Sequence, residues 1–266
     1  MEPERPDNFS MPKPMNNPSE GPSPVGIMLN LDCLKFDGQL ILGNLDLTLE
    51  HGRITCLLGP SGVGKSSILK ILAGFIPLPG ESRITVSDSG SLAGRLSYMD
   101  QQDLLLPWAT VLDNLLIGGR LRGKTPDIDR ARALLDHVGL ADRQDALPST
   151  LSGGMRQRVA LARTLMEGAP IVLMDEPFSA LDAITKFRLQ DLAAEMLTGK
   201  TVLLITHDPL EALRLGHNIH VLSGNPATLS PPLIPEGRIP RDPTDDVLKH
   251  HYSNIMARLA DSGQQP

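Results

Sequence analysis

The sequence has little cysteine, and this narrows the setting in which the protein works. Its 266 residues include 2 cysteines, Cys33 and Cys56, which lie far apart and form neither a CxxC motif nor a cluster with histidine. This usage is typical of a reducing compartment. Cys56 lies in an apolar run, where a small buried thiol is the expected role.

Long apolar runs are missing as well. The longest are short stretches such as residues 171–174 and 202–205, whereas a membrane-spanning helix needs about 20 apolar residues. The first residues also lack the apolar stretch of a secretory signal. We therefore expect a soluble, cytosolic protein that does not cross a bilayer.

An excess of positive charge is the third missing feature. The chain carries 25 Lys+Arg against 31 Asp+Glu, a net charge of -6. This balance argues against broad, sequence-independent binding of nucleic acid, although a local basic patch stays open. What the chain does have is 41% apolar residues, enough for a sizeable core in one or two domains.

The two ends of the chain differ in composition from its middle. Residues 1–25 are rich in Pro, Asn, Ser and Glu and have almost nothing apolar to bury, so they predict a disordered tail. Met11 and Met28 are alternative start sites within or next to this tail. Residues 223–266 are expected to form a C-terminal extension that contains several Pro-rich turns. The main domain is expected between them, over residues 26–222.

Strands alternate with helices along this main domain. Short apolar runs over residues 53–58, 171–174 and 201–205 predict buried strands, and helices are expected over residues 65–73 and 183–197. This alternation implies an α/β fold whose mostly parallel sheet is covered on both faces.

The sequence pattern changes over roughly residues 102–150. Helices are expected over residues 110–117 and 128–138, with breaks at Gly118-Gly119 and at Gly123-Lys124-Thr125-Pro126 between them. We interpret this part as a mostly helical insertion in the α/β domain. Outside it, alternating Leu45, Leu47 and Leu49 predict a half-buried strand, and a last helix is expected over residues 245–259.

A glycine-rich loop connects the first buried strand to the helix that follows it. It reads Gly59-Pro60-Ser61-Gly62-Val63-Gly64-Lys65-Ser66 and matches G-x-x-x-x-G-K-[ST] in the strand–loop–helix context that this motif requires. The glycines let the backbone approach phosphate oxygens closely, and the positive end of the helix favours an anion. Lys65 supplies a charge to the β- and γ-phosphates, and the Ser66 hydroxyl reaches Mg²⁺. The loop therefore predicts nucleotide binding.

Two adjacent acids follow the buried strand at residues 171–174. A carboxylate at the carboxyl end of a strand lies in the crevice where α/β sheets bind ligands. Asp175 can therefore support Mg²⁺, directly or through water. Glu176 points to the other face and can polarise a water in line with the γ-phosphate.

A second pair of glycines precedes another helix. Ser152 is a good N-cap, and Gly153 and Gly154 come before a helix expected over residues 155–166. The N-terminus of that helix is a second place that accepts an anion. The chain thus has two elements that can bind phosphate but one phosphate-loop lysine. This indicates that a nucleotide is held between two subunits.

Over about residues 30–222 the chain resembles the ATP-binding subunit of an ABC transporter. The stretch LSGGMRQRVALAR from Leu151 resembles the signature motif of that family, and MDEPFSALD from Met174 resembles its Walker B motif and D-loop. The resemblance implies a P-loop ATPase core with a mostly parallel sheet, an antiparallel β subdomain and a helical subdomain over about residues 102–165.

The resemblance also implies roles for residues outside these motifs. Gln101 matches the Q-loop glutamine that touches Mg²⁺ and the attacking water, and His207 matches the switch histidine at the γ-phosphate. Phe36 stands at about the place of the aromatic residue that stacks on adenine, with a core position as the alternative. The remaining residues implied to contact the nucleotide are Ser67, Gln157 and Asp182, the last of these in the D-loop that communicates between subunits.

One stretch departs from the family pattern. Importers of the nitrate, sulfonate and taurine type commonly read Glu-Pro after the Q-loop glutamine, whereas residues 99–103 read Met-Asp-Gln-Gln-Asp. Asp100 stands where an apolar residue is usual, and Gln102 is an alternative register for the Q-loop glutamine. Residues 105–108 nevertheless fit that importer group, and Trp108 is expected to face either a membrane partner or the core of the helical subdomain.

The function implied by the resemblance is ATP hydrolysis that energises a membrane importer for a small solute. Its cofactors would be ATP and Mg²⁺. Its partners would be a second copy of the chain, transmembrane permease subunits and, indirectly, a substrate-binding protein, with no nucleic acid among them. It would lie peripherally at the cytoplasmic face of the inner cell membrane. Residues 206–227 are similar to subunits that serve uptake of hydroxymethylpyrimidine, a thiamine precursor.

Other classes of function stay open. A soluble ABC-type ATPase that acts on DNA or ribosomes would usually show a long inserted coiled coil or two cassettes in one chain, and this sequence has neither. A regulatory module that binds without hydrolysis would normally have lost Lys65, Glu176 or His207, and all are intact. No motif excludes an exporter subunit. For residues 223–266, packing on the nucleotide domain, regulation of the dimer and simple solubilisation all remain open.

Overall fold

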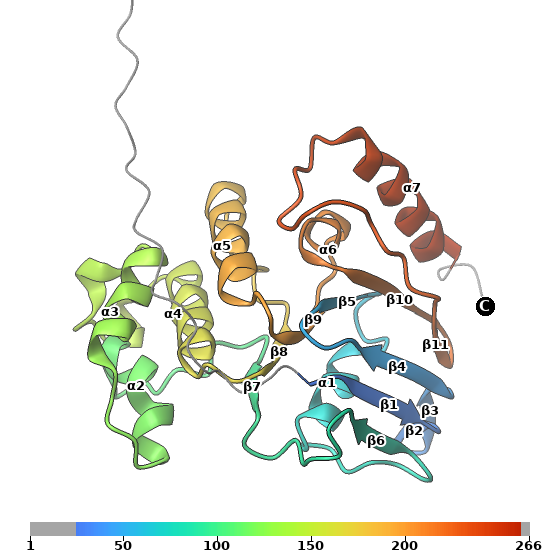
Figure 1. Cartoon of the computed structure of the whole chain (residues 1–266), viewed down its shortest axis with the longest axis horizontal. Coiled ribbons are helices and arrows are strands. Elements are labelled where there is room, and N and C mark those ends of the chain that lie inside the picture. Colours follow the sequence, from blue (N-terminus) through green and yellow to red (C-terminus); the bar gives the residue numbers. More distant parts are fainter. Residues whose placement is uncertain (1–24, 262–266) are drawn as a thin grey trace, which may run out of the picture.

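The structure is a computed structural model that describes residues 25–261, so the tail expected over residues 1–25 lies almost wholly outside the described residues. Figure 1 shows an α/β core that contains the strands and, to its left, a lobe formed by helices α2, α3 and α4. None of the helices in the described range is long and apolar enough to cross a membrane.

A parallel sheet forms the centre of the core. Its strands lie side by side in the order β10-β5-β9-β8-β7 and pair in parallel. They are β5 (Ile54–Leu58), β7 (Leu96–Met99), β8 (Ile171–Asp175), β9 (Thr201–Ile205) and β10 (Asn218–Gly224). Every residue of β5, β8 and β9 is buried, as in strands covered on both faces. The predicted α/β fold is confirmed.

Helices cover the two faces of this sheet. Side chains alternate between the faces of a strand. Accordingly, Val172 and Met174 join the apolar cluster that contains α5 and α6, whereas Ile171 and Leu173 join the cluster that contains α1. The covering helices are α1 (Lys65–Leu72), α5 (Ala183–Met196), α6 (Pro209–Leu215) and, outside α6, α7 (Asp246–Asp261).

A second, antiparallel sheet packs against the α1 side. It has the order β4-β1-β6, and in β4 (Leu45–Leu49) the leucines are buried while the polar residues between them are exposed, as their alternation predicts. Its other strands are β1 (Ile27–Leu31) and β6 (Arg83–Val86). The short strands β2 (Leu34–Phe36), β3 (Gln39–Leu42) and β11 (Ala227–Leu229) extend the parallel sheet beyond β10.

The helical lobe contains one correction to the sequence prediction. Helix α2 (Val111–Leu121) continues through Gly118-Gly119, where a break was expected, and ends before Gly123, which has φ +67°. Its buried face, which includes Val111 and Leu115, packs against α4, and this packing maintains the helix past the two glycines. The lobe also contains α3 (Ile128–His137), η1 (Ala141–Arg143), η2 (Pro148–Thr150) and α4 (Gly153–Met166).

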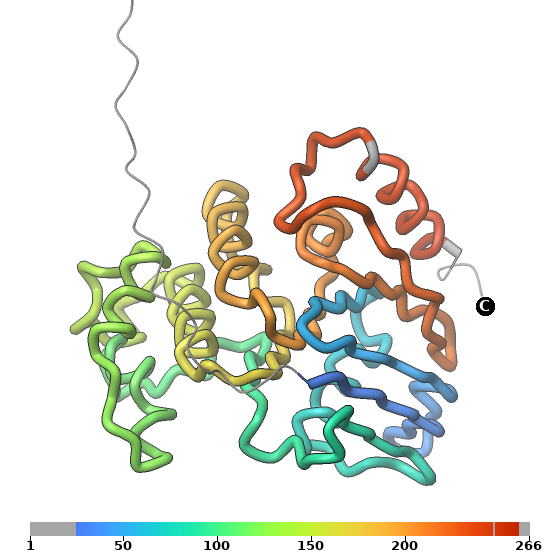
Figure 2. The backbone as a smooth tube through the Cα atoms, in the orientation of Figure 1, coloured from blue at the N-terminus to red at the C-terminus, as the bar shows by residue number. Residues whose placement is uncertain are grey.

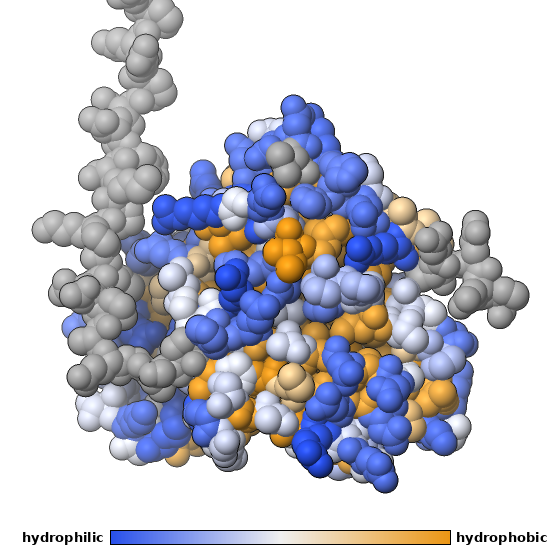
Figure 3. All heavy atoms as spheres, turned by 45° about the vertical axis from the view of Figure 1, so that its right-hand side comes forward, coloured by the Kyte–Doolittle hydropathy of each residue, from blue (hydrophilic) through white to orange (hydrophobic). Residues whose placement is uncertain are grey.

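The C-terminal part of the chain packs onto the core. Figure 2 shows its red tube running back across the orange segment that contains α6, and α7 contacts both α6 and β10. The guanidinium of buried Arg241 donates hydrogen bonds to carbonyls at the end of α6, those of Leu213 and Gly216, at 2.7 Å each. Strand β10 runs past residue 222, where the extension was expected to begin, and β11 lies in the sheet. Figure 3 shows apolar residues gathered in the middle of this side, with hydrophilic residues around them.

Candidate functional site

The phosphate-binding loop predicted at residues 59–66 lies at the carboxyl end of β5 and leads into α1. Its glycines have positive φ, +157° at Gly59 and +105° at Gly64, the residue that caps α1. A side chain at Gly59 would collide with the Leu222 carbonyl, and one at Gly64 would come within 2.7 Å of the Leu42 side chain. Both positions therefore require glycine, and the loop can present its N–H groups at the positive end of α1.

Lys65 turns back over this loop. Its Nζ donates hydrogen bonds to the carbonyls of Gly59 and Pro60, at 2.8 Å each. Burial lowers the pKa of Lys65, and the nearby carboxylates of Glu176 and Asp175 oppose that shift. The ammonium is thus already held at the loop where phosphates would bind.

A cavity of about 290 Å³ lies beside the loop. Phe36 is 63% exposed at its rim, so it is not a core aromatic residue. An aromatic face next to a phosphate loop can stack on a purine base. The cavity is lined by Leu34, Phe36, Ile41, Gly62, Gly64, Lys65, Ser66 and Ser67.

Asp175 ends strand β8 and is buried next to Ser66. Burial raises the pKa of the Asp175 carboxyl, while a hydrogen bond with Ser66 and the charge of Lys65 lower it. A serine hydroxyl, an aspartate carboxylate and the side-chain oxygen of Gln101 are all hard oxygen donors of the kind that Mg²⁺ prefers. The residues present therefore fit Mg²⁺ with water as the remaining ligands.

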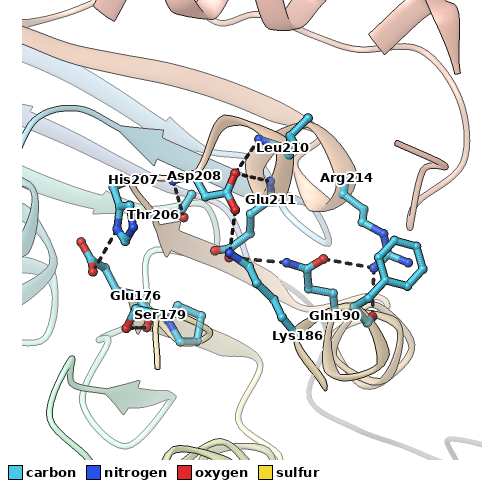
Figure 4. A network of polar contacts seen from close by, with 12 residues as sticks. Glu176, Ser179, Lys186, Gln190, Thr206, His207, Asp208, Leu210, Glu211 and Arg214 are labelled. Carbon is cyan, nitrogen blue, oxygen red and sulfur yellow. Dashed lines mark hydrogen bonds and ion pairs between the residues drawn. The ribbon is translucent and has the colours of Figure 1, made fainter. Parts of the chain in front are cut away.

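Glu176 lies at the centre of a three-way contact, part of which Figure 4 shows. Its Oε2 atom is 3.1 Å from His207 Nδ1 and 3.4 Å from Gln101 Nε2. The side chain of Glu176 is 14% exposed and that of His207 is 58% exposed. The ends of β7, β8 and β9 thus bring together the three residues predicted to act at the γ-phosphate.

The backbone of Glu176 adopts φ +48°, an uncommon conformation for a residue with a side chain. Such a residue costs about 1 to 3 kcal/mol and persists where the surroundings hold it. Its N–H donates to the Ile205 carbonyl at 2.9 Å, and its carbonyl accepts from Ser179 Oγ at 3.1 Å and Gln157 Nε2 at 3.3 Å. These contacts hold the backbone of Glu176 in this conformation.

The structure distinguishes the two candidate registers after β7. Gln101, and not Gln102, reaches Glu176. Asp100, which departs from the family pattern, accepts hydrogen bonds from Tyr98 Oη at 3.0 Å and from the Gln102 N–H at 3.1 Å. A polar residue is accommodated here because it organises the turn that presents Gln101.

The second anion-binding device lies apart from the first within one chain. Ser152 caps α4, with its Oγ accepting from the Met155 N–H at 3.3 Å, and both Ser152 and Gly153 are exposed. Figure 1 shows α4 in the helical lobe, well separated from α1 in the plane of the view. This end of α4 therefore faces outward, where another chain could meet it.

Asp182 lies in an exposed segment between β8 and α5. Its Oδ1 accepts the Thr185 N–H at 3.0 Å and so caps α5, and this backbone hydrogen bond lowers the pKa of Asp182. Gln157, also predicted to be a nucleotide contact, is buried against the carbonyls of Glu176 and Pro177. It lies behind the site and supports the Glu176 turn.

Sequence reasoning missed two polar clusters around the site. In one, Arg156 Nε pairs with Asp103 at 2.8 Å and Arg163 donates to the carbonyls of Asp103 and Leu104, so α4 holds the segment after Gln101. In the other, Lys186 bridges the two acids just beyond His207, Asp208 and Glu211. The Asp208-Pro209 pair, a typical helix start, was the available sequence signal for the second cluster.

Comparison with known proteins finds relatives that are ATP-binding proteins of transporters. A family model described as ABC transporter matches residues 42–179. The aliphatic sulfonates import ATP-binding protein SsuB 2 of Burkholderia cenocepacia is 38% identical over 95% of this chain and 92% of its own length. An uncharacterized ABC transporter ATP-binding protein of Haemophilus influenzae is 42% identical over 79% of this chain and 88% of its own.

A solved structure adds an assembled relative. A dimeric ATP-binding cassette, MJ0796, in a post-hydrolysis state bound to ADP and Pi, superposes with a TM-score of 0.69 at 28% identity. The alignment covers 80% of this chain and 100% of that one.

Proposed function

This chain belongs to the ABC transporter family of ATP-binding subunits, and on that basis we propose which of its residues act in ATP hydrolysis and what each of them does. The chain is an ATP-binding and ATP-hydrolysing subunit of the importer type. The assignment of residues rests on one observation. Gln101 and His207 both contact the same oxygen of Glu176, beside Asp175 and the phosphate loop.

Each residue near the γ-phosphate has a distinct task. Glu176 accepts the proton of the attacking water, since its carboxylate is aimed by the strained turn. His207 and Gln101 orient that carboxylate and the water, and His207 can also donate to a γ-phosphate oxygen. Lys65 balances charge on the phosphates.

The oxygen donors of Ser66, Asp175 and Gln101 would hold Mg²⁺. Bound Mg²⁺ would neutralise charge that develops on the phosphate oxygens. Phe36 would stack on adenine, and Ser67 lines the same cavity.

Two copies of the chain complete each site in this proposal. The Ser152–Gly154 turn of one copy, whose first two residues are exposed, would cover the nucleotide on the phosphate loop of the other, and Asp182 would lie at the same interface. The dimeric cassette bound to ADP and Pi supports this arrangement. Residues 26–222 would act as the ATPase unit, with residues 102–165 as its helical subdomain.

The surface after Gln101 is proposed to meet a transmembrane permease. Trp108 is 76% exposed and Leu104 is 56% exposed, so both can bury apolar area against a partner. The family matches support association with transporter subunits at the cytoplasmic face of the membrane. A substrate-binding protein would supply the solute to that permease.

The cargo is proposed to be a small organic sulfonate or a compound like it. This follows from the relatives named as aliphatic sulfonate import proteins, including one in Rhodococcus jostii that is 46% identical over 75% of this chain. Uptake of hydroxymethylpyrimidine stays a prediction from residues 206–227. An exporter subunit or a soluble ATPase for DNA or ribosomes has no comparable support among these relatives.

Co-purification tests the transport role. A tagged chain should bring a multi-span permease from its native membranes, and the solute bound by the associated binding protein should be a sulfonate. Recovery of DNA or ribosomes in place of a permease would overturn the importer assignment. Recovery of a permease whose binding protein selects a pyrimidine would support the importer assignment but would change the proposed cargo from a sulfonate to a pyrimidine.

A further inference from the structure

A buried charge cluster connects helix α5 to the segment that carries His207 (Figure 4). Lys186 Nζ lies 2.6 Å from Asp208 Oδ2 and 3.0 Å from Glu211 Oε2. The side chains of Lys186 and Asp208 are 21% and 31% exposed, and that of Glu211 is 2% exposed. Three charged groups are thus held together largely away from solvent.

In this cluster one ammonium faces two carboxylates, and burial raises the pKa of Glu211. Burial alone would lower the pKa of Lys186, but Glu211 and Asp208 more than offset this and raise it above its ordinary value. Lys186 in turn lowers the pKa of Asp208, although burial opposes the shift. Removing the lysine would leave two carboxylates facing each other with little water, which is costly.

A second set of contacts continues the connection along the two helices. Gln190 donates to Glu211 at 3.4 Å and accepts from Arg214 at 3.2 Å. The Arg214 guanidinium pairs with Asp191 at 2.6 Å and lies 3.5 Å from the centre of the Phe187 ring. Residues 186–191 of α5 and residues 211–214 of α6 are therefore joined by a continuous set of polar contacts.

Lys186 connects the exposed segment 179–182, before α5, with the segment that carries His207. Lys186 donates its N–H to the Asp182 carbonyl at 2.8 Å, so it belongs to the first turn after the exposed segment 179–182. Asp208 directly follows His207 and caps α6, with Oδ1 accepting from the Leu210 N–H at 2.9 Å while Oδ2 faces Lys186. One carboxylate thus fixes the start of α6 and its distance from α5.

We propose that Lys186 is a positioning residue for ATP hydrolysis. Through its contacts with Asp208 and Glu211 it holds His207 in place. Because Lys186 comes shortly after segment 179–182, a shift of that segment changes the position of His207. This rests on the proposed roles of His207 and of the dimer interface. The His207 ring is 58% exposed, so packing contributes little to its placement, and its position depends on the contact with Glu176 and on the backbone next to it at Asp208. When a second copy contacts segment 179–182, α5 carries that shift through Lys186 to His207 and Glu176.

The test compares ATP hydrolysis by full-length variants. Lys186→Met should lower kcat about 10- to 100-fold, because small misplacement of a reacting group has effects of this size. The KM for ATP should change by less than about twofold, since the phosphate loop is untouched. Lys186→Arg, which can still span both carboxylates, should restore most of the rate. Lys200→Met is the matched control, because Lys200 is half-buried on the Ala169 carbonyl outside the cluster.

The outcomes separate this inference from the proposed function. Parent-like kcat in folded Lys186→Met, or no rescue by Lys186→Arg, would overturn the positioning role. If Lys186→Met does not fold, Asp208→Asn takes its place, because asparagine keeps an oxygen for the α6 cap while losing the ion pair. His207→Ala is measured alongside. Parent-like hydrolysis by His207→Ala would instead overturn the proposed site itself.

Discussion

At the scale of single residues, the site depends on one uncommon backbone conformation. Glu176 adopts φ +48° because its N–H is bound to the end of β9 and its carbonyl is held by Ser179 and Gln157. This places its carboxylate against His207 and Gln101 and leaves the neighbouring Asp175 carboxylate near Ser66. Two adjacent acids thereby receive different surroundings, in line with the different tasks proposed for them.

The first prediction concerns Glu176→Gln. The amide keeps the shape and hydrogen bonds of the side chain but is a poor proton acceptor, so kcat should fall about 100-fold or more while ATP still binds. Steady-state hydrolysis and nucleotide-binding titration measure the two effects, and ATP should trap a dimer on gel filtration. Glu195→Gln, on the exposed side of α5, is the control and should behave as the parent. Turnover at the parent rate would show that Glu176 is not the base.

At the scale of elements, helix α6 is held from both ends. Asp208 caps its start beside His207, and the Arg241 guanidinium binds the Leu213 and Gly216 carbonyls at its end, as well as the Pro235 carbonyl. Arg241 belongs to the C-terminal extension, so this extension supports the helix behind the switch histidine. Among the roles left open by the sequence, the structure shows packing on the core.

A stability prediction follows for Arg241→Met. Losing these hydrogen bonds leaves buried carbonyls without partners, each costing about 1 to 3 kcal/mol, so the free energy of unfolding should fall by roughly 3 kcal/mol. Chemical denaturation followed by circular dichroism measures the change. Arg238→Met, an exposed arginine in the same segment, should alter stability by less than about 0.5 kcal/mol. Equal stability of the two variants would mean that the extension does not brace α6.

At the scale of the whole molecule, the proposed site is divided between two copies of the chain. Residues 60–62 of the phosphate loop and residues 152–153 at the start of α4 are exposed but lie in different parts of the fold. The related cassette bound to ADP and Pi is a dimer. A site built across two copies would couple closure of the dimer to the γ-phosphate, since each nucleotide would join both chains.

Mixed dimers test this composite site. Ser152→Arg and Lys65→Ala should each inactivate the homodimer, because every site then lacks one of its two parts. An equal mixture should regain up to about a quarter of the parent rate, since half of the dimers are hybrids with one intact site. ATP hydrolysis before and after subunit exchange measures the gain, with unmixed samples as controls. No recovery after demonstrated exchange would indicate that both elements serve a nucleotide on the same chain.

The sequence alone predicted the α/β fold, most strands and helices and the phosphate-binding loop. These features depend on local chemistry: apolar runs, caps, and glycines that a phosphate loop requires. Gln101 and His207 were singled out through the family resemblance, and the structure places both against Glu176. It also predicted Ser152 as the cap of α4, but began that helix two residues late, because glycines at the first turn are poor helix formers yet tolerated there.

Only the tertiary structure decided the rest, because those features depend on what lies opposite a residue. Helix α2 continues through Gly118 because its buried face packs against α4, and Gln101 is the glutamine that reaches Glu176 in the turn after β7. In the Lys186 cluster, Lys186 contacts acids that lie 22 or more residues away in the chain. In the sequence, Lys186 looks like an ordinary residue of a helix face, and Asp208 looks like a helix cap. Sequence specifies which groups are available, and packing specifies which of them meet.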